Sequence, residues 1–124
     1  MSFIAHNPER HVGRVVGNGH CVAFTREAAD MPHTSLWTRG MRVRGQTLAR
    51  GTAIATFGAS GKYENRTDGS SHVAILEGEE DNGLRVWDQW LGRAVGSRLI
   101  RFKGGSGLPV DDGDAYHVVE TATT

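Results

Sequence analysis

The single cysteine of this chain, Cys21, lies in a context in which a thiol can act as a nucleophile. Gly17 and Gly19 precede it and helix-forming residues follow, which predicts a loop that turns into a helix with Cys21 on its first turn. The positive end of a helix dipole lowers the pKa of a thiol and favours the reactive thiolate. Most free cysteines are instead small apolar side chains buried under helices, so this segment alone leaves both interpretations open.

A nucleophilic cysteine needs a base, and the base needs a third group that orients it. His72 is the best-placed base, because it begins a predicted strand directly after the polar loop over residues 58–71. Pairing across an Asn82-Gly83 turn would bring Asp88 close to His72, whereas a register change of one residue would present Gln89 instead. The third position therefore stays open between these two side chains. The histidines that compete for the role of base are His6, His11, His20, His33, His72 and His117.

The elements that must position these residues are predicted to be helices in the first part of the chain and strands in the rest. A helix is predicted over residues 20–30, because Met31-Pro32 ends it, and a short helical turn is predicted over 34–37, ending near Gly40. A turn is predicted over residues 78–83. Helices followed by a run of strands predict an α+β fold, with the cysteine-bearing helix packed on an antiparallel sheet. The predicted strands cover residues 52–57, 72–77, 84–90, 97–102 and 115–120.

Length and composition narrow the function classes. A chain of 124 residues predicts a single domain, with its core over about residues 17–103 and a flexible tail after residue 120. The 14 basic and 14 acidic residues cancel, so no electrostatic argument favours nucleic acid as a partner. No apolar stretch approaches the roughly 20 residues of a membrane span, so we expect no membrane insertion.

The sequence also predicts no metal and no cofactor. Neither the histidines nor Cys21 have the spacing of a zinc site. The acidic cluster over Asp111–Asp114 lacks the full set of spaced ligands that calcium requires and is interpreted as a solvated turn.

The order of these segments resembles the CHAP family (cysteine, histidine-dependent amidohydrolase/peptidase), a group of papain-like bacterial cell-wall hydrolases. The resemblance runs from about Gly17 to Trp90 and implies a papain-like fold. It implies that Cys21 attacks an amide, that His72 is the base, and that Asp88 or a neighbouring amide orients the imidazole. The segments that carry the resemblance are Gly19-His-Cys21-Val-Ala-Phe, Leu36-Trp37, Gly40-Met-Arg-Val43, Gly51-Thr-Ala-Ile-Ala-Thr-Phe57, Ser71-His72-Val-Ala-Ile75 and Val86-Trp-Asp88-Gln-Trp90.

One departure from the family pattern bears on the site. The residue before the nucleophile is often Gln in CHAP sequences, where it can help to form the oxyanion hole, and here it is His20. The resemblance then implies that the backbone N–H of Cys21 stabilises the oxyanion together with His20 or Asn18. Gln89 and Trp90 are further candidates for contact with substrate.

The resemblance implies a cysteine amidase or endopeptidase that cleaves amide bonds of peptidoglycan stem peptides through a thioester. The N-terminus shows no basic start followed by an apolar core, so we expect synthesis in the cytoplasm without a signal peptide. Small amidases of this kind resemble toxins that type VI secretion systems inject into the periplasm of a rival cell. A cognate immunity protein is then an expected partner.

Two alternatives belong to other function classes. A papain-like domain that has lost catalysis would use the cleft only for binding, and its Cys21 would be buried and unreactive. A cytoplasmic thiol peptidase or deamidase would use the same residues on a protein substrate.

Overall fold

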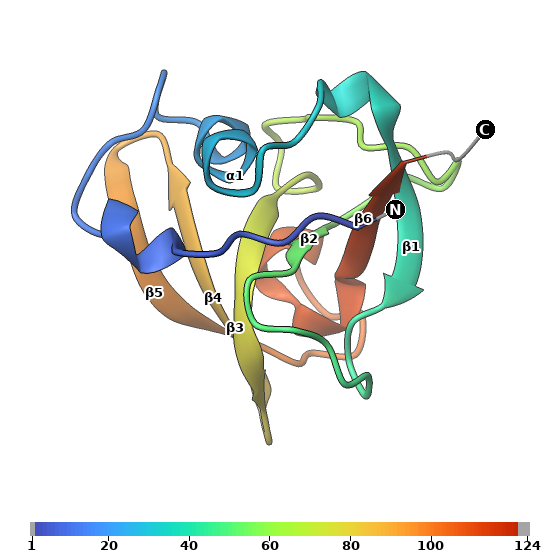
Figure 1. The fold of residues 1–124 in the computed structure, drawn as a ribbon. Helices are drawn as coiled ribbons and strands as arrows, with labels where there is room; N and C mark the ends of the chain where they lie inside the picture. The colour runs from blue at the N-terminus through green and yellow to red at the C-terminus, as the bar shows by residue number, and fades with distance from the viewer. Residues whose placement is uncertain (1, 122–124) are drawn as a thin grey trace.

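The computed structural model describes residues 2–121 and has one α-helix packed against one face of a six-stranded antiparallel sheet (Figure 1). The strand order is β1-β6-β2-β3-β4-β5, so the last strand of the chain lies inside the sheet. This architecture confirms the predicted α+β class. The elements are α1 (Cys21–Ala29), β1 (Trp37–Arg42), β2 (Ala53–Ala55), β3 (Val73–Glu80), β4 (Gly83–Trp90), β5 (Arg93–Arg101) and β6 (His117–Thr121), with short 3-10 helices over Pro8–His11, Thr34–Leu36, Pro109–Asp111 and Gly113–Ala115.

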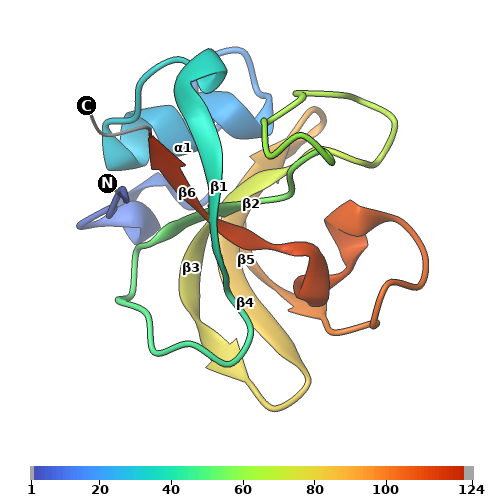
Figure 2. The ribbon, with the colours of Figure 1, turned by 90° about the vertical axis from the view of Figure 1, so that its right-hand side faces the viewer.

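Alternation along the strands divides the buried side chains between two cores. On β3, Val73 and Ile75 belong to the core under α1, whereas Ala74 and Leu76 belong to the core on the opposite face. Figure 2 shows how strongly the sheet twists, with the segment over residues 102–116 beside it. Phe102 packs against the second core from this segment. Burial on both faces fixes β3 and β4 between two packed layers. His72 directly precedes β3, and Asp88 and Gln89 lie on β4.

The helix begins and ends where the sequence predicts. Cys21 is its first residue, and Asp30 ends it in the left-handed conformation with its N–H bonded to the Arg26 carbonyl. Phe24 is fully buried and holds α1 on the sheet. The predicted helix over residues 20–30 is therefore confirmed to within one residue at each end.

The prediction for the segment after the helix is wrong in part. Only Thr34–Leu36 forms a helical turn, and Trp37–Arg42 continues as β1 instead of a turn that ends near Gly40. β1 pairs with β6, which lies some eighty residues further along the chain. A single sequence does not reveal this partner, and the polar residues of β1 carry little of the alternation that marks a half-buried strand.

Strand boundaries also differ from the predictions. β3 runs on to Glu80, which leaves Asp81 and Asn82 as a two-residue turn in place of the predicted turn over residues 78–83. β5 begins at Arg93, four residues before the predicted start. Thr121 pairs with Trp37 in the sheet, and the remainder of the predicted tail lies outside the described residues. Within residues 2–121, no helix has the length and apolar character needed to cross a membrane.

Gly51 joins the N-terminal segment to the sheet and gives the first testable prediction. Its φ is +97°, its carbonyl accepts from Ala5 N at 2.8 Å, and a Cβ built on it would clash with the Ala5 carbonyl oxygen. Gly45 has a similar φ of +86° but open space around the same position. We expect Gly45→Ala to lower the free energy of unfolding by about 1–2 kcal/mol, because of its backbone conformation alone. Gly51→Ala should lower the free energy of unfolding by about 1–3 kcal/mol more than Gly45→Ala does, because of the clash with Ala5.

Urea unfolding of the two variants measures this difference. Equal losses of unfolding free energy would mean that the N-terminal segment moves away without cost and is not part of the packed structure.

Candidate active site

Cys21 lies at the N-terminus of α1, where its sulphur is close to groups that favour its charged form. His20, the residue before the helix, makes no side-chain cap, so the N–H groups of the first turn are not taken up by a capping side chain. The His72 imidazole and the backbone N–H of Val73 interact with the sulphur and lower the pKa of the thiol. The hydroxyl of Tyr63 lies 3.8 Å from it. This environment favours a thiolate over a thiol.

Gln89 holds the loop that leads into α1. Its side chain is fully buried, accepts from Val16 N at 2.9 Å, and donates to the carbonyls of Val16 at 2.8 Å and His20 at 2.9 Å. These bonds fix the backbone next to Cys21. The alternative in which Gln89 orients the histidine has no support in this geometry, because its amide bonds to the loop and not to His72.

His72 is held at both its backbone and its ring. Its N–H donates to Thr56 Oγ1 at 3.0 Å, and its carbonyl accepts from Thr56 N at 3.0 Å. Its ring is buried, and Nε2 lies 2.8 Å from Asp88 Oδ2. A hydrogen bond from Nε2–H to the carboxylate leaves Nδ1 as the nitrogen that faces Cys21. The backbone clamp and the carboxylate together fix the orientation that a base requires.

Asp88 is a fully buried carboxylate with three charged partners. Besides His72, it accepts from Arg93 Nη1 at 2.9 Å and from Arg98 Nε at 2.8 Å. Gly96 lies opposite Asp88 on β5, and a Cβ there would come within 2.8 Å of Arg93 Nη2, so this glycine leaves room for the arginine. A buried carboxylate is stable only when its charge is paired in this way.

A β-bulge determines that Asp88, rather than its neighbour, meets His72. Near the turn, Gly78 pairs with Arg85, but one step further along β4 Val86 pairs with Leu76, so β3 has one extra residue. Without it, continuing the register from the turn would set Asp88 opposite Ile75, on the face toward α1. The bulge therefore turns Asp88 to the other face and leaves Gln89 directed toward the loop before α1.

These contacts shift the pKa of each group in the direction that an ion pair needs. Burial alone would raise the pKa of Cys21, but the hydrogen bond and charge of His72 hold it below its usual value. Burial would lower the pKa of His72, but its bonds to Asp88 and Cys21 raise that pKa to about 9. Burial opposes ionisation of Asp88 too, yet His72 and Arg98 keep its pKa low. The site therefore favours a thiolate beside an imidazolium.

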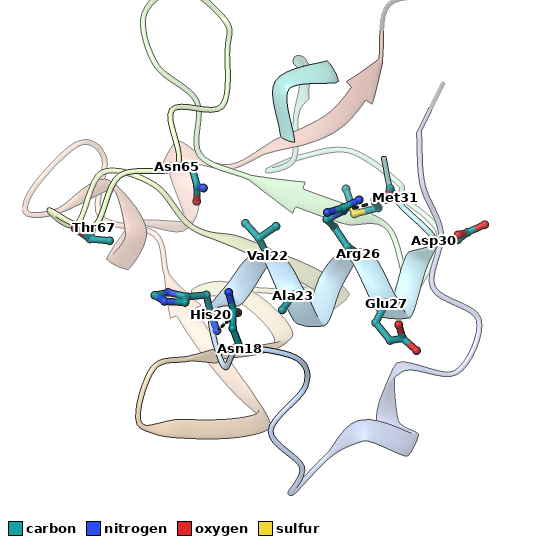
Figure 3. Close-up of a pocket in the computed structure, with 10 residues that line it drawn as sticks. All are labelled: Asn18, His20, Val22, Ala23, Arg26, Glu27, Asp30, Met31, Asn65 and Thr67. Atoms are coloured by element: carbon teal, nitrogen blue, oxygen red, sulfur yellow. Dashed lines mark hydrogen bonds between the residues drawn. The ribbon is translucent and has the colours of Figure 1, made fainter. Parts of the chain in front are cut away.

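Two hollows lie beside the elements of the candidate site, one along α1 and the other against His72. A hollow of about 680 Å³ runs along the outer side of α1, between Val22 and Arg26 on the helix and Asn65 on the loop after β2, with His20 just before the helix also lining it (Figure 3). A second, of about 250 Å³, is lined by His72, Trp90, Arg98 and other residues. Thr67 lines both, so the two hollows adjoin at this residue of the loop after β2.

The remaining residues predicted for the site, Asn18, His20 and Trp90, have different surroundings. Asn18 Oδ1 accepts from His20 N at 3.1 Å, so this side chain shapes the loop, and the His20 side chain lines the larger cavity. Trp90 is 41% exposed and lies edge-to-face on His72, with Arg93 and Arg98 stacked on its ring. Among residues 2–121, no group of three or more His, Cys, Asp and Glu side chains is arranged to hold a metal ion.

Sequence reasoning missed four contributors to this site. Arg93 and Arg98 could have been predicted to lie near Asp88, because a second tight turn at Leu91-Gly92 returns β5 alongside it. Tyr63 could not have been predicted, because it lies in a loop whose path a sequence does not determine. The N–H of Val73 is a backbone group, which has no sequence signal of its own.

Comparisons with known proteins give consistent matches, all to amidase effectors. The family model described as domesticated amidase effector 2 matches residues 1–119. A domesticated amidase effector 2 from Ixodes scapularis is 34% identical over 111 residues, covering 85% of this chain and 73% of that protein. A type VI secretion amidase effector 2 protein from Salmonella typhi is 38% identical over 77 residues, covering 60% of this chain and 56% of the relative.

The solved structure of a type 6 secretion amidase effector 2 (Tae2) has the same fold, with a TM-score of 0.82. It is 27% identical, and the match covers 98% of this chain and 96% of the other. The predicted papain-like fold and the predicted relation to type VI secretion amidases are confirmed by these matches. The chain belongs to the domesticated amidase effector 2 family.

Proposed function

We propose that this protein hydrolyses amide bonds in peptidoglycan stem peptides, with Cys21 as nucleophile, His72 as base and acid, and Asp88 as the group that orients His72. The observation that carries the proposal is the buried series of alternating charges from the arginines through Asp88 and His72 to Cys21. A cysteine with only a structural role needs neither an imidazole nor a carboxylate behind it. This argues against a domain that merely binds.

In the first half of the reaction, the Cys21 thiolate attacks the carbonyl carbon of the amide and forms a C–S bond. The electron pair of the carbonyl moves to oxygen, near the N–H groups at the start of α1. When the intermediate collapses, the C–N bond breaks and the His72 imidazolium gives its proton to the leaving amine. A thioester on Cys21 and a neutral His72 remain.

In the second half, water replaces the amine. Neutral His72 takes a proton from water, and the oxygen attacks the thioester carbon. The C–S bond breaks, the acid leaves, and the thiolate beside the imidazolium is restored. Asp88 stays ionised throughout and stabilises the imidazolium each time it forms.

The two cavities support an extended substrate that crosses the site. The larger one carries both signs of charge, with Arg26, Glu27 and Asp30 along the helix. The smaller one places Trp90 and Arg98 beside His72. A stem peptide, which has charged groups on both sides of its amide bonds, matches this distribution. We assign one side of the scissile bond to each cavity.

The family relation supports a role in competition between bacteria. The relatives include a protein named as a type VI secretion effector, so we propose that a secretion machine delivers this chain to a target periplasm. A cognate immunity protein that covers the two cavities is the partner we propose for the producing cell.

Digestion of purified peptidoglycan tests the proposed activity. The wild-type protein should release soluble fragments, and mass spectrometry should identify one type of cleaved amide bond. Cys21→Ala and His72→Ala should both lower the rate by at least about 1,000-fold, since members of such a catalytic group act as a unit.

Full activity in either folded variant would remove that residue from the mechanism. A wild-type protein with a reactive thiol and no activity on peptidoglycan would direct attention to a protein substrate. A thiol that does not react with iodoacetamide would support the binding domain.

Substitutions at the adjacent positions of β4 separate the two candidates for the third role. Asp88→Asn should lower kcat/KM by at least about 100-fold, because the imidazolium loses its counter-charge. Gln89→Ala should instead lower stability by about 1–3 kcal/mol, because it leaves buried loop groups without partners. Kinetics and urea unfolding of both variants measure the difference, and the reverse ranking of the rates would give the role to Gln89.

The pH dependence of kcat/KM follows from the ion pair. The active form carries a thiolate and an imidazolium, so the rate should rise with pH through the lowered pKa of the cysteine and fall near pH 9 as His72 loses its proton. Because Asp88 helps to raise the pKa of His72, Asp88→Asn should move the alkaline limb to lower pH. An alkaline limb that stays in place in this variant would contradict the assigned interaction.

A further inference from the structure

Tyr63 lies in the loop between β2 and β3 and reaches the sulphur of Cys21. The distance from its hydroxyl oxygen to Sγ is 3.8 Å, within the range of a hydrogen bond to sulphur. The other groups that lower the pKa of this thiol are His72 and the N–H of Val73. The catalytic scheme above does not use Tyr63.

The position of the Tyr63 ring is fixed by packing. Only 7% of the residue is exposed, and its ring lies 5.0 Å from that of Trp37 and 6.3 Å from that of Phe57, measured between centroids. The loop itself is tied to the sheet, since Lys62 forms a β-bridge with Thr38. A side chain held from both sides delivers its hydroxyl to the sulphur with little further loss of entropy.

The hydroxyl remains a donor throughout the working range of pH. Burial and the neighbouring Cys21 raise the pKa of Tyr63 far above that of an ordinary tyrosine. It therefore keeps its proton and is not a second base for the thiol. A permanent O–H donor beside a sulphur that alternates between thiolate and thioester favours the charged state of that sulphur.

We propose that Tyr63 is a further catalytic residue whose hydroxyl donates a hydrogen bond to Cys21 Sγ and stabilises the thiolate together with His72. The inference rests on the proposed function for its biological meaning, but the interaction itself belongs to the resting protein. No covalent step involves Tyr63, because its proton stays on the phenol oxygen.

The consequence can be measured on the thiol without any substrate. We expect Tyr63→Phe to raise the midpoint of the pH profile for iodoacetamide alkylation by about one unit, which is about tenfold less thiolate on the acid side. A thiolate of higher pKa is intrinsically more nucleophilic, so the plateau rate at high pH should increase about threefold. Simple loss of packing does not produce both a higher pH at the midpoint of alkylation and a higher alkylation rate on the plateau.

Tyr116→Phe is the matched control, since the chain has only these two tyrosines. The Tyr116 hydroxyl is also buried, but it donates to the Val110 carbonyl at 2.8 Å, and its ring belongs to the core on the opposite face of the sheet. Both variants lose one buried hydroxyl and keep the ring. The control should therefore leave the midpoint and the plateau of alkylation unchanged.

A second measurement keeps the test informative if Tyr63→Phe folds poorly. In the Tyr116→Phe background, Tyr63 is the one tyrosine left, so growth on 3,5-difluorotyrosine modifies this hydroxyl alone. Fluorination makes the phenol a stronger donor, which should lower the midpoint of alkylation.

The outcomes separate this inference from the proposed function. A folded Tyr63→Phe protein with the wild-type midpoint and plateau would overturn the role of Tyr63, as would a fluorinated protein with an unchanged midpoint. If wild-type protein has a reactive thiolate but digests no peptidoglycan, the proposed function fails while the alkylation profiles still decide the role of Tyr63.

Discussion

The buried carboxylate of Asp88 is the constraint on which the site depends. A fully buried negative charge is stable only if cations meet both of its oxygens, and the structure supplies Arg93, Arg98 and His72. Each of these contacts constrains something else. The arginines tie β5 to β4, and the imidazole can satisfy the carboxylate only in the orientation that turns Nδ1 toward Cys21. The charge that would destabilise the core on its own thus sets the geometry and ionisation of His72 and Cys21, the pair that we propose to be catalytic.

Strand β4 positions both reactive residues through two neighbouring side chains. Asp88 faces one side of the sheet and orients His72, while Gln89 faces the other side and holds the loop before α1. Since adjacent residues of a strand are related by the pleat, the histidine and the start of the helix are fixed relative to one short piece of backbone. The site therefore does not depend on the placement of two independent segments, although Cys21 and His72 are far apart in the sequence.

Much of this arrangement can be predicted from the sequence, because its signals are local. The glycines before Cys21, the proline after the helix and the hydrophobic pattern of the central strands each act within a few residues. The rest depends on distant partners. β1 forms only because β6 returns to pair with it, and the bulge in β3 that selects Asp88 over Gln89 has no marker in the local pattern. Tyr63 is the extreme case, since its position depends on the whole path of a loop between two strands.

The loop after β2 and the sheet with α1 contribute different parts of the candidate site. The sheet and α1 supply the thiol, the imidazole and the carboxylate, and their geometry follows from buried hydrogen bonds. The loop after β2 supplies Asn65 and Arg66 to one cavity each and Thr67 to both. If the proposed function holds, we expect a change in the loop to alter which peptides fit without disturbing the charges behind Cys21, and a change in β4 to affect the reaction of every substrate. Tyr63 is the exception, because it extends from the same loop to the sulphur and so connects the segment that we propose to contact substrate with the atom that we propose to react.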